Sequence, residues 1–153
     1  MPRVVVTTYL DAPPDAVWAA LQRTAVLRHV SAPLIRFIPL DPTNLPETWS
    51  EGEYRVAMRL FGFVPLGTQW IRVSWPAPEG ETRYVRDNGT GTLAARWDHL
   101  ISIAPEGQGT RYTDRVDVEA GVLSPVTAVF ARLFYAHRQR RWRTLVARAF
   151  ALR

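Results

Sequence analysis

The chain has 153 residues, of which 47% are hydrophobic and 22% charged, a balance typical of one globular domain with a substantial core. It contains no Cys, which excludes disulfides, Cys-bound metals and thiol nucleophiles, and no apolar run approaches the ~20 residues of a membrane span. The net charge is +5, yet all 19 basic residues are Arg, which indicates compositional bias rather than a phosphate-binding surface. We therefore expect a cytoplasmic protein without a signal peptide or nucleic-acid partner.

The first third of the chain predicts a strand, two short helices and a second strand. Arg3–Leu10 is rich in Val and Thr, as strands are, and Asp11–Asp15 has the Pro and Asp of a helix start. A second short helix is expected near residues 25–30. Four prolines then punctuate the chain, and residues 34–38 between them predict a strand at a sheet edge.

The middle of the chain predicts three more strands. Residues 53–60 alternate, with Tyr54 and Met58 on the apolar face, and strands are expected over 68–75 and 82–87. Asp87-Asn88-Gly89 has the composition of a tight turn.

The segment Phe61–Gly67 is interpreted as a turn that is unusually apolar. Loops are normally polar and lie on the surface. Phe61 and Phe63 in this turn are therefore expected either to pack onto the domain or to frame the mouth of a ligand site.

The last third predicts two long strands and one long helix. Residues 92–103 place Trp97 and His99 on one face, and residues 110–119 place Tyr112 and Asp114 on one face. Ser124 is expected to cap a helix that continues to the C-terminus. An apolar stripe is predicted for its first half: Val126, Val129, Phe130, Leu133, Phe134 and His137.

The second half of this helix carries a stripe that is rotated from the first. Trp142 and Leu145 define it, which predicts either a bend near residues 138–141 or a different neighbour for the helix end. A homodimer partner and a plain core contact are both consistent with this pattern. The Arg-rich residues 138–143 are interpreted as a solvated helix face.

These elements predict an α+β fold with a curved antiparallel sheet of about seven strands around a long C-terminal helix. The motifs "Asp11-Ala12-Pro13-Pro14-Asp15-Ala16-Val17-Trp18", "Trp97-x-His99" and "Thr110-x-x-x-Asp114-x-Val116" together resemble the START/Bet v 1-like helix-grip superfamily (SRPBCC), which includes polyketide cyclases. The resemblance covers residues 1–153 as one domain. It implies an internal cavity between sheet and helix, but no shared catalytic set.

The candidate chemistry centres on His99 and Asp114. Strand parity places both on the inner face, where they would hydrogen-bond and act as a general base, orient a ligand, or satisfy each other structurally. The remaining ligand-binding candidates are Trp97, Tyr112, His137, Phe130, Phe134, Tyr54, Met58, Phe61 and Phe63. No metal-ligand spacing or phosphate-binding loop is present in the sequence, so no metal and no cofactor are expected.

The sequence favours the binding of a small hydrophobic or aromatic molecule, lipid-like or polyketide-like, in the internal cavity. The first alternative is a cyclase or dehydratase that uses the His99–Asp114 pair. The second is a protein-interaction module, with Trp142 and Phe150 at the end of the helix as its surface.

Overall fold

The computed structural model describes residues 2–152 and contains one seven-stranded sheet and three α-helices. The strands are β1 Arg3–Leu10, β2 Ile35–Asp41, β3 Gly52–Leu60, β4 Val64–Ser74, β5 Arg83–Gly91, β6 Arg96–Glu106 and β7 Gly109–Glu119. The helices are α1 Pro14–Leu21, α2 Thr24–Ser31 and α3 Ser124–Ala147, the last preceded by a short 3-10 turn at Gly121–Leu123. The predicted element order and fold class are confirmed.

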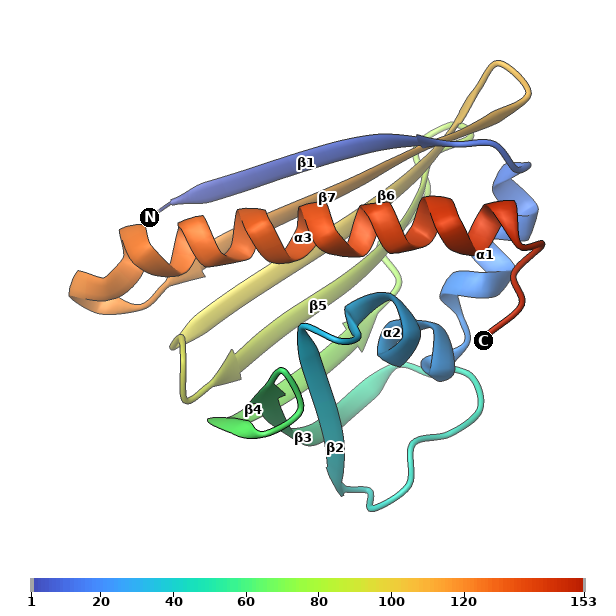
Figure 1. Cartoon of the computed structure of the whole chain (residues 1–153). Helices are drawn as coiled ribbons and strands as arrows, with labels where there is room; N and C mark the ends of the chain where they lie inside the picture. The colour runs from blue at the N-terminus through green and yellow to red at the C-terminus, as the bar shows by residue number, and fades with distance from the viewer. Residues whose placement is uncertain (1, 153) are drawn as a thin grey trace.

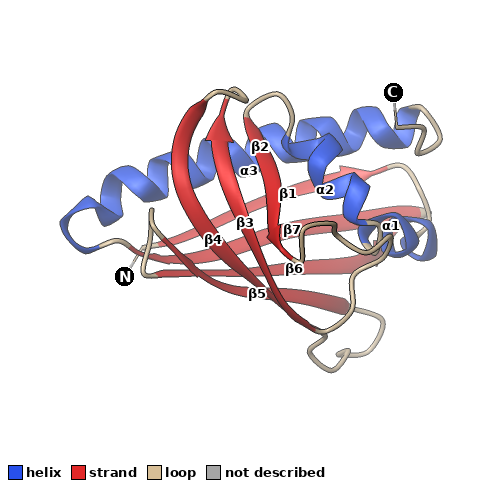
Figure 2. Cartoon of the chain, turned by 90° about the horizontal axis from the view of Figure 1, so that it is seen from below, coloured by secondary structure: helices blue, strands red, loops and turns tan. Residues whose placement is uncertain are grey.

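All strand pairs in the sheet are antiparallel, and the spatial order is β1-β7-β6-β5-β4-β3-β2. The first strand therefore lies beside the last one, while β2 forms the opposite edge, as its prolines predict. Figure 1 shows α3 crossing the sheet alongside β1, with α1 and α2 near its C-terminal end. Figure 2 shows the curvature, since β2, β3 and β4 run at a steep angle to β1 and β7.

The turns between the middle strands differ from the predicted ones. The apolar turn is limited to Phe61–Phe63, because Val64–Gly67 already belong to β4, where Val64 and Pro65 pair with β3. Asp87-Asn88-Gly89 is not a turn but lies within β5. A side chain at Gly89 would collide with Gln69 and with the carbonyl oxygen of Trp70, so this glycine allows the close approach of β4 rather than a reversal of the chain. The reversal occurs at residues 92–95, and the next strand begins at Arg96.

The buried face of α3 also differs from the predicted one. Val126, Val129 and Leu133 are 68%, 61% and 65% exposed. The buried side chains instead follow one continuous stripe: Ala131, Phe134, Tyr135, Arg138, Gln139, Trp142 and Leu145. The spacing of three or four residues is maintained throughout, so the predicted rotation of the stripe was wrong. Hydrophobicity alone misplaces this face because two of its buried residues, Arg138 and Gln139, are polar.

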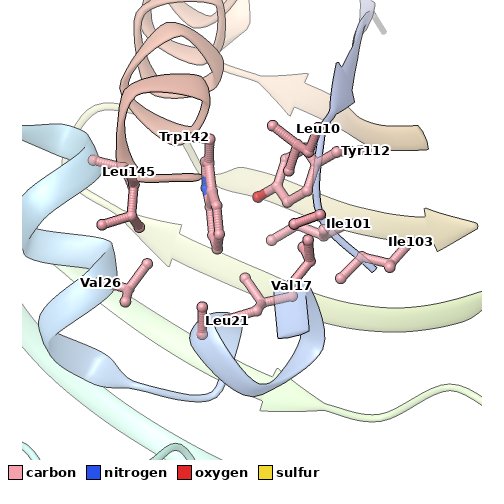
Figure 3. Packing of buried hydrophobic residues seen from close by; sticks show 12 residues of the cluster. Leu10, Val17, Leu21, Val26, Ile101, Ile103, Tyr112, Trp142 and Leu145 are labelled. Carbon is pink, nitrogen blue, oxygen red and sulfur yellow. The ribbon is translucent and has the colours of Figure 1, made fainter. Parts of the chain in front are cut away.

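The end of α3 packs into the core rather than forming a free surface. Trp142 is fully buried, and Figure 3 shows it among Leu21, Val26 and Tyr112. The helix does not continue to the C-terminus but ends at Ala147. Ala149 and Phe150 then adopt positive φ values of 52° and 64°, which turn the chain back so that Phe150 packs against the same core. The surface expected for a partner at Trp142 is therefore not available.

The start of α3 is closed by Ser124, although by a different geometry from the predicted cap. Ser124 is the first helical residue, and its hydroxyl donates to the carbonyl oxygen of Gly121 at 2.8 Å and accepts from the amide of Ala120 at 2.9 Å.

No helix within residues 2–152 is both long enough and apolar enough to span a membrane.

Candidate functional site

A pocket lies between the inner face of the sheet and the central part of α3. It offers about 110 Å³ to the centre of a water-sized sphere. This is on the order of the ~150 Å³ cavity that holds benzene in an engineered protein, so the volume suits one aromatic ring. Its walls are mostly apolar, with contributions from α2, β2 through β6 and α3. The polar side chains at its surface are those of Gln69, Asp87, His99, Tyr135 and Arg138.

Five of the predicted ligand-binding residues lie together at this pocket. The sheet supplies Met58, Trp97 and His99, and α3 supplies Phe130 and Phe134. Alternation along β6 puts Trp97 and His99 on the inner face, whereas Phe130 and Phe134 are one helical turn apart and face the same way. Their rings are nearly parallel, with an interplanar angle of 6° and centroids 6.0 Å apart.

The other six predicted residues do not line this pocket. Tyr112 is fully buried and packs on Trp142, and Asp114 lies behind His99. His137 donates from Nε2 to the carbonyl oxygen of Ala32 at 2.9 Å. The hydroxyl of Tyr54 is bonded to Ser50. Phe61 and Phe63 are exposed at the hairpin tip, where Phe61 borders a separate outer groove.

The predicted hydrogen bond between His99 and Asp114 is present. Nε2 of His99 and Oδ1 of Asp114 are 2.6 Å apart, and both side chains are buried. The residues are diagonal neighbours, because His99 lies opposite Val116 and Asp114 lies opposite Ile101. Burial lowers the pKa of His99 more than the neighbouring carboxyl raises it. The imidazole is therefore neutral at pH 7, with its Nε2–H donating to Asp114.

Gln139 extends this pair to the helix and to the first strand. Its Nε2 donates to Oδ2 of Asp114 at 2.9 Å and to the carbonyl oxygen of Val6 at 2.6 Å. Both carboxyl oxygens of Asp114 are thus engaged by donors. These hydrogen bonds link β6, β7, β1 and α3, and they determine which face of α3 points toward the pocket. The ring nitrogen Nδ1 of His99 forms no hydrogen bond within the described residues.

Trp97 and Tyr135 form a second polar contact at the pocket wall. The indole Nε1–H of Trp97 donates to the hydroxyl oxygen of Tyr135 at 2.8 Å. Burial raises the pKa of Tyr135, which keeps its hydroxyl protonated. This proton has no acceptor among the residues that the structure describes.

Two charged residues at the pocket were not predicted as site residues. Asp87, in β5, accepts the backbone N–H of Arg72 at 2.8 Å, next to the gap in the β4–β5 ladder between the pairs Trp70–Thr90 and Val73–Asp87. The residue keeps part of its accessible surface because it borders the pocket, but burial of the carboxyl group raises its pKa to about 7. Arg138, in α3, is only 5% exposed and lines the pocket from the opposite side.

A signal for Arg138 exists in the sequence. It lies four residues after Phe134 and four before Trp142, which places all three on one helical face. The neighbouring arginines of residues 138–143 point the other way, because a run of charged residues is usually exposed to solvent. For Asp87 there was no such signal, since its segment has the composition of a turn. Within residues 2–152 no three His, Asp or Glu side chains are grouped as metal ligands.

Solved structures with the same fold come from several bacteria. Protein CV1439 from Chromobacterium violaceum superposes with a TM-score of 0.70 at 17% identity, covering 95% of this chain and 98% of that one. A START superfamily protein from Mycobacterium smegmatis gives a TM-score of 0.63 at 15% identity, covering 96% and 98%. DynU16, a putative protein in the dynemicin biosynthetic locus, gives 0.59 at 14%, covering 95% of this chain and 47% of that one.

These likenesses establish the fold as the START/Bet v 1-like helix-grip fold, as the sequence motifs predicted. No protein in the comparison with curated proteins matches the chain. A family model described as "Domain of unknown function (DUF8410)" matches residues 8–146. Because this match spans most of the sheet and almost all of α3, the chain belongs to the DUF8410 family.

Proposed function

We propose that the protein binds a small hydrophobic or aromatic molecule in the pocket beneath α3. The observation that carries the proposal is the composition of this pocket, in which aromatic and aliphatic side chains surround a volume that suits one ring. Removal of apolar surface from water contributes roughly 25 cal/mol per Å² to such binding, and a few polar groups orient the ligand. Trp97, Phe130 and Phe134 supply flat apolar surfaces from opposite walls.

The test begins with native mass spectrometry of the freshly purified protein, followed by titration of the ligand-free form with toluene. Binding is followed by the indole N–H resonances of the six Trp residues. We expect shifts for the pocket residues Trp49, Trp97 and Trp142, whereas Trp70, which is outside the pocket, stays unchanged. The proposal would be contradicted if the protein carried no co-purified adduct and millimolar toluene caused no localised shift.

A matched pair of variants locates the binding. Met58 lines the pocket, while its neighbour Arg59 is exposed on the other face of β3. We expect Met58→Trp to fill the space and abolish toluene binding, and Arg59→Trp to leave it unchanged. Equal effects of the two substitutions would place the bound toluene elsewhere. Thermal unfolding of both variants checks that each remains folded.

A second candidate function is general-base catalysis of the cyclase or dehydratase type. The hydrogen bond to Asp114 orients His99 and assigns the ring proton to Nε2, so that Nδ1 has the lone pair that accepts a proton. The likeness to DynU16, a putative protein in a biosynthetic locus, supports this candidate only at the level of the fold. If the protein is an enzyme, we expect His99→Ala to abolish turnover and to leave ligand affinity nearly intact. If it is a binding protein, no turnover is expected in the wild type or in the variant.

A further inference from the structure

Arg138 is a buried cation without an anionic partner. Its side chain is 95% enclosed, it forms no hydrogen bond or ion pair with any described residue, and its Nε is fully buried and unpaired. The guanidinium carbon lies 5.7 Å from the ring centroid of Phe134 and 5.2 Å from that of Tyr135. These aromatic faces stabilise the cation partially, but they leave its N–H donors unused.

The two carboxyl groups whose charge acts on Arg138 through space, those of Asp114 and Asp87, form no ion pair or hydrogen bond with it. Asp114 already accepts hydrogen bonds from His99 and Gln139 with its two oxygens. Asp87 borders the same pocket, but none of its oxygens lies within the 4.0 Å of an ion pair with Arg138. Burial raises the pKa of Asp87 to about 7, so part of the population carries no charge there at neutral pH. A buried arginine is rarely left in this state unless another group supplies the anion.

A second unused donor lies next to Arg138. Residues three apart on a helix share a face, which brings the hydroxyl of Tyr135 to the same part of the pocket wall. That hydroxyl accepts from Trp97 and keeps its own proton available. The guanidinium and this hydroxyl form a pair of donors at the wall of a mostly apolar pocket. A carboxylate is the group that a planar guanidinium fork binds best, through two parallel hydrogen bonds.

We propose that the ligand of this pocket is an aromatic or short-chain carboxylic acid, whose carboxylate binds Arg138 and Tyr135 while its apolar part contacts Trp97 and Phe130. This inference rests on the proposed function, since it specifies the class of molecule that the same pocket binds. It also assigns Arg138 as the residue that selects for negative charge, because no other arginine is among the described residues that line the pocket.

The test compares three probes of similar size at pH 6.5, namely benzoate, its neutral analogue benzamide, and toluene, by calorimetry and by the Trp97 indole resonance. We expect the wild-type protein to bind benzoate at least tenfold more tightly than benzamide. In Arg138→Met this preference disappears, with toluene binding retained. Arg138→Lys keeps the charge without the fork and is expected to fall between the two, and Tyr135→Phe weakens benzoate binding severalfold.

Arg140 provides the matched control, because it lies on the exposed side of the same helix. Arg140→Met changes the net charge by the same amount and is expected to leave benzoate affinity unchanged. An equal loss in Arg138→Met and Arg140→Met would overturn the proposal, since the effect would then reflect the overall charge. Thermal unfolding establishes that Arg138→Met is folded, and the wild-type preference for benzoate over benzamide needs no variant.

The outcomes separate the two proposals. Binding of toluene without any preference for benzoate over benzamide overturns the carboxylate assignment and leaves the hydrophobic-binding function in place. Failure of all three probes overturns both. A preference for benzoate that is lost only in the Arg138 and Tyr135 variants supports both.

Discussion

The two halves of α3 cover the same sheet, but one half is closely packed against it and the other borders an unfilled pocket. Toward its C-terminal end, Trp142 and Leu145 are fully buried against Val17, Val26 and Tyr112, in a close-packed cluster (Figure 3). One turn earlier, Arg138 faces a pocket and forms no hydrogen bond or ion pair within residues 2–152. The comparison teaches that stability and binding are concentrated at different positions of one helix face, with Trp142 bordering both the cluster and the pocket. The packed half holds the helix in place, which allows the other half to keep an unfilled space and an unpaired charge.

The largest loss of stability is expected when Trp142 is removed. Trp142→Ala leaves a large hole in the packed cluster, and such changes cost about 3–5 kcal/mol in the free energy of unfolding. Urea unfolding measures the loss. Trp70→Ala is the control, because this Trp is half-buried, lies outside the pocket and belongs to none of the packed clusters. If the two variants lost the same stability, the close-packed cluster would not be the main support of α3.

Asp87→Asn tests the cost of the charge in the pocket half. The folded carboxyl has a pKa of about 7, against ~3.9 in an unfolded chain, so the folded state binds more protons between these values. The free energy of unfolding therefore falls as the pH rises through this interval. The amide keeps the acceptor for Arg72 but cannot ionise. We expect Asp87→Asn to be more stable than the wild type at pH 8, by on the order of 4 kcal/mol, and nearly equal to it at pH 4.

His99 changes the free energy of unfolding with pH in the opposite direction, but it is present in both the wild type and Asp87→Asn. Its pKa is lowered by burial, so the unfolded chain binds the proton more readily and stability falls as the pH drops below about 6.5. The difference between Asp87→Asn and wild type cancels this contribution. A constant difference from pH 4 to pH 8 would mean that Asp87 does not titrate near neutrality.

The smallest effect is expected on the outer face of the same helix. Leu133 is 65% exposed, although it directly precedes the buried Phe134. Leu133→Ala is expected to change the free energy of unfolding by no more than about 0.5 kcal/mol. Leu145→Ala, the buried counterpart, is expected to cost about 2–5 kcal/mol. A larger loss for Leu133 that depends on protein concentration would indicate that a second copy covers this face.

Strand parity predicted the sheet part of the site from sequence. Alternation along residues 97–103 and 110–118 placed His99 and Asp114 inward, and the structure brings them within 2.6 Å. A period of two residues is robust because a shift by one residue would expose the whole apolar face. The order of the elements followed from the same patterns, together with the change to helical periodicity after Gly121.

The helix part of the site was harder to predict, because its inner face is partly polar. Arg138 and Gln139 interrupt the apolar stripe, and Val126, Val129 and Leu133 lie exposed where hydrophobicity alone would bury them. Tertiary contacts decide such cases. Gln139 is drawn inward by the carbonyl oxygen of Val6 and by Asp114, partners more than 20 residues away that no local pattern reveals.

The pairing of β1 with β7 has a consequence for how the chain is made. Val4 lies opposite Val116 and Leu10 opposite Thr110, so the strand of this sheet that is synthesised first pairs with the strand of the sheet that is synthesised last. Until more than 100 further residues have been synthesised, this Val- and Thr-rich segment has no partner in the sheet. Such distant pairing slows folding and leaves a strand edge open to other chains. The synthesis of β7 and α3 therefore also protects the nascent domain from aggregation.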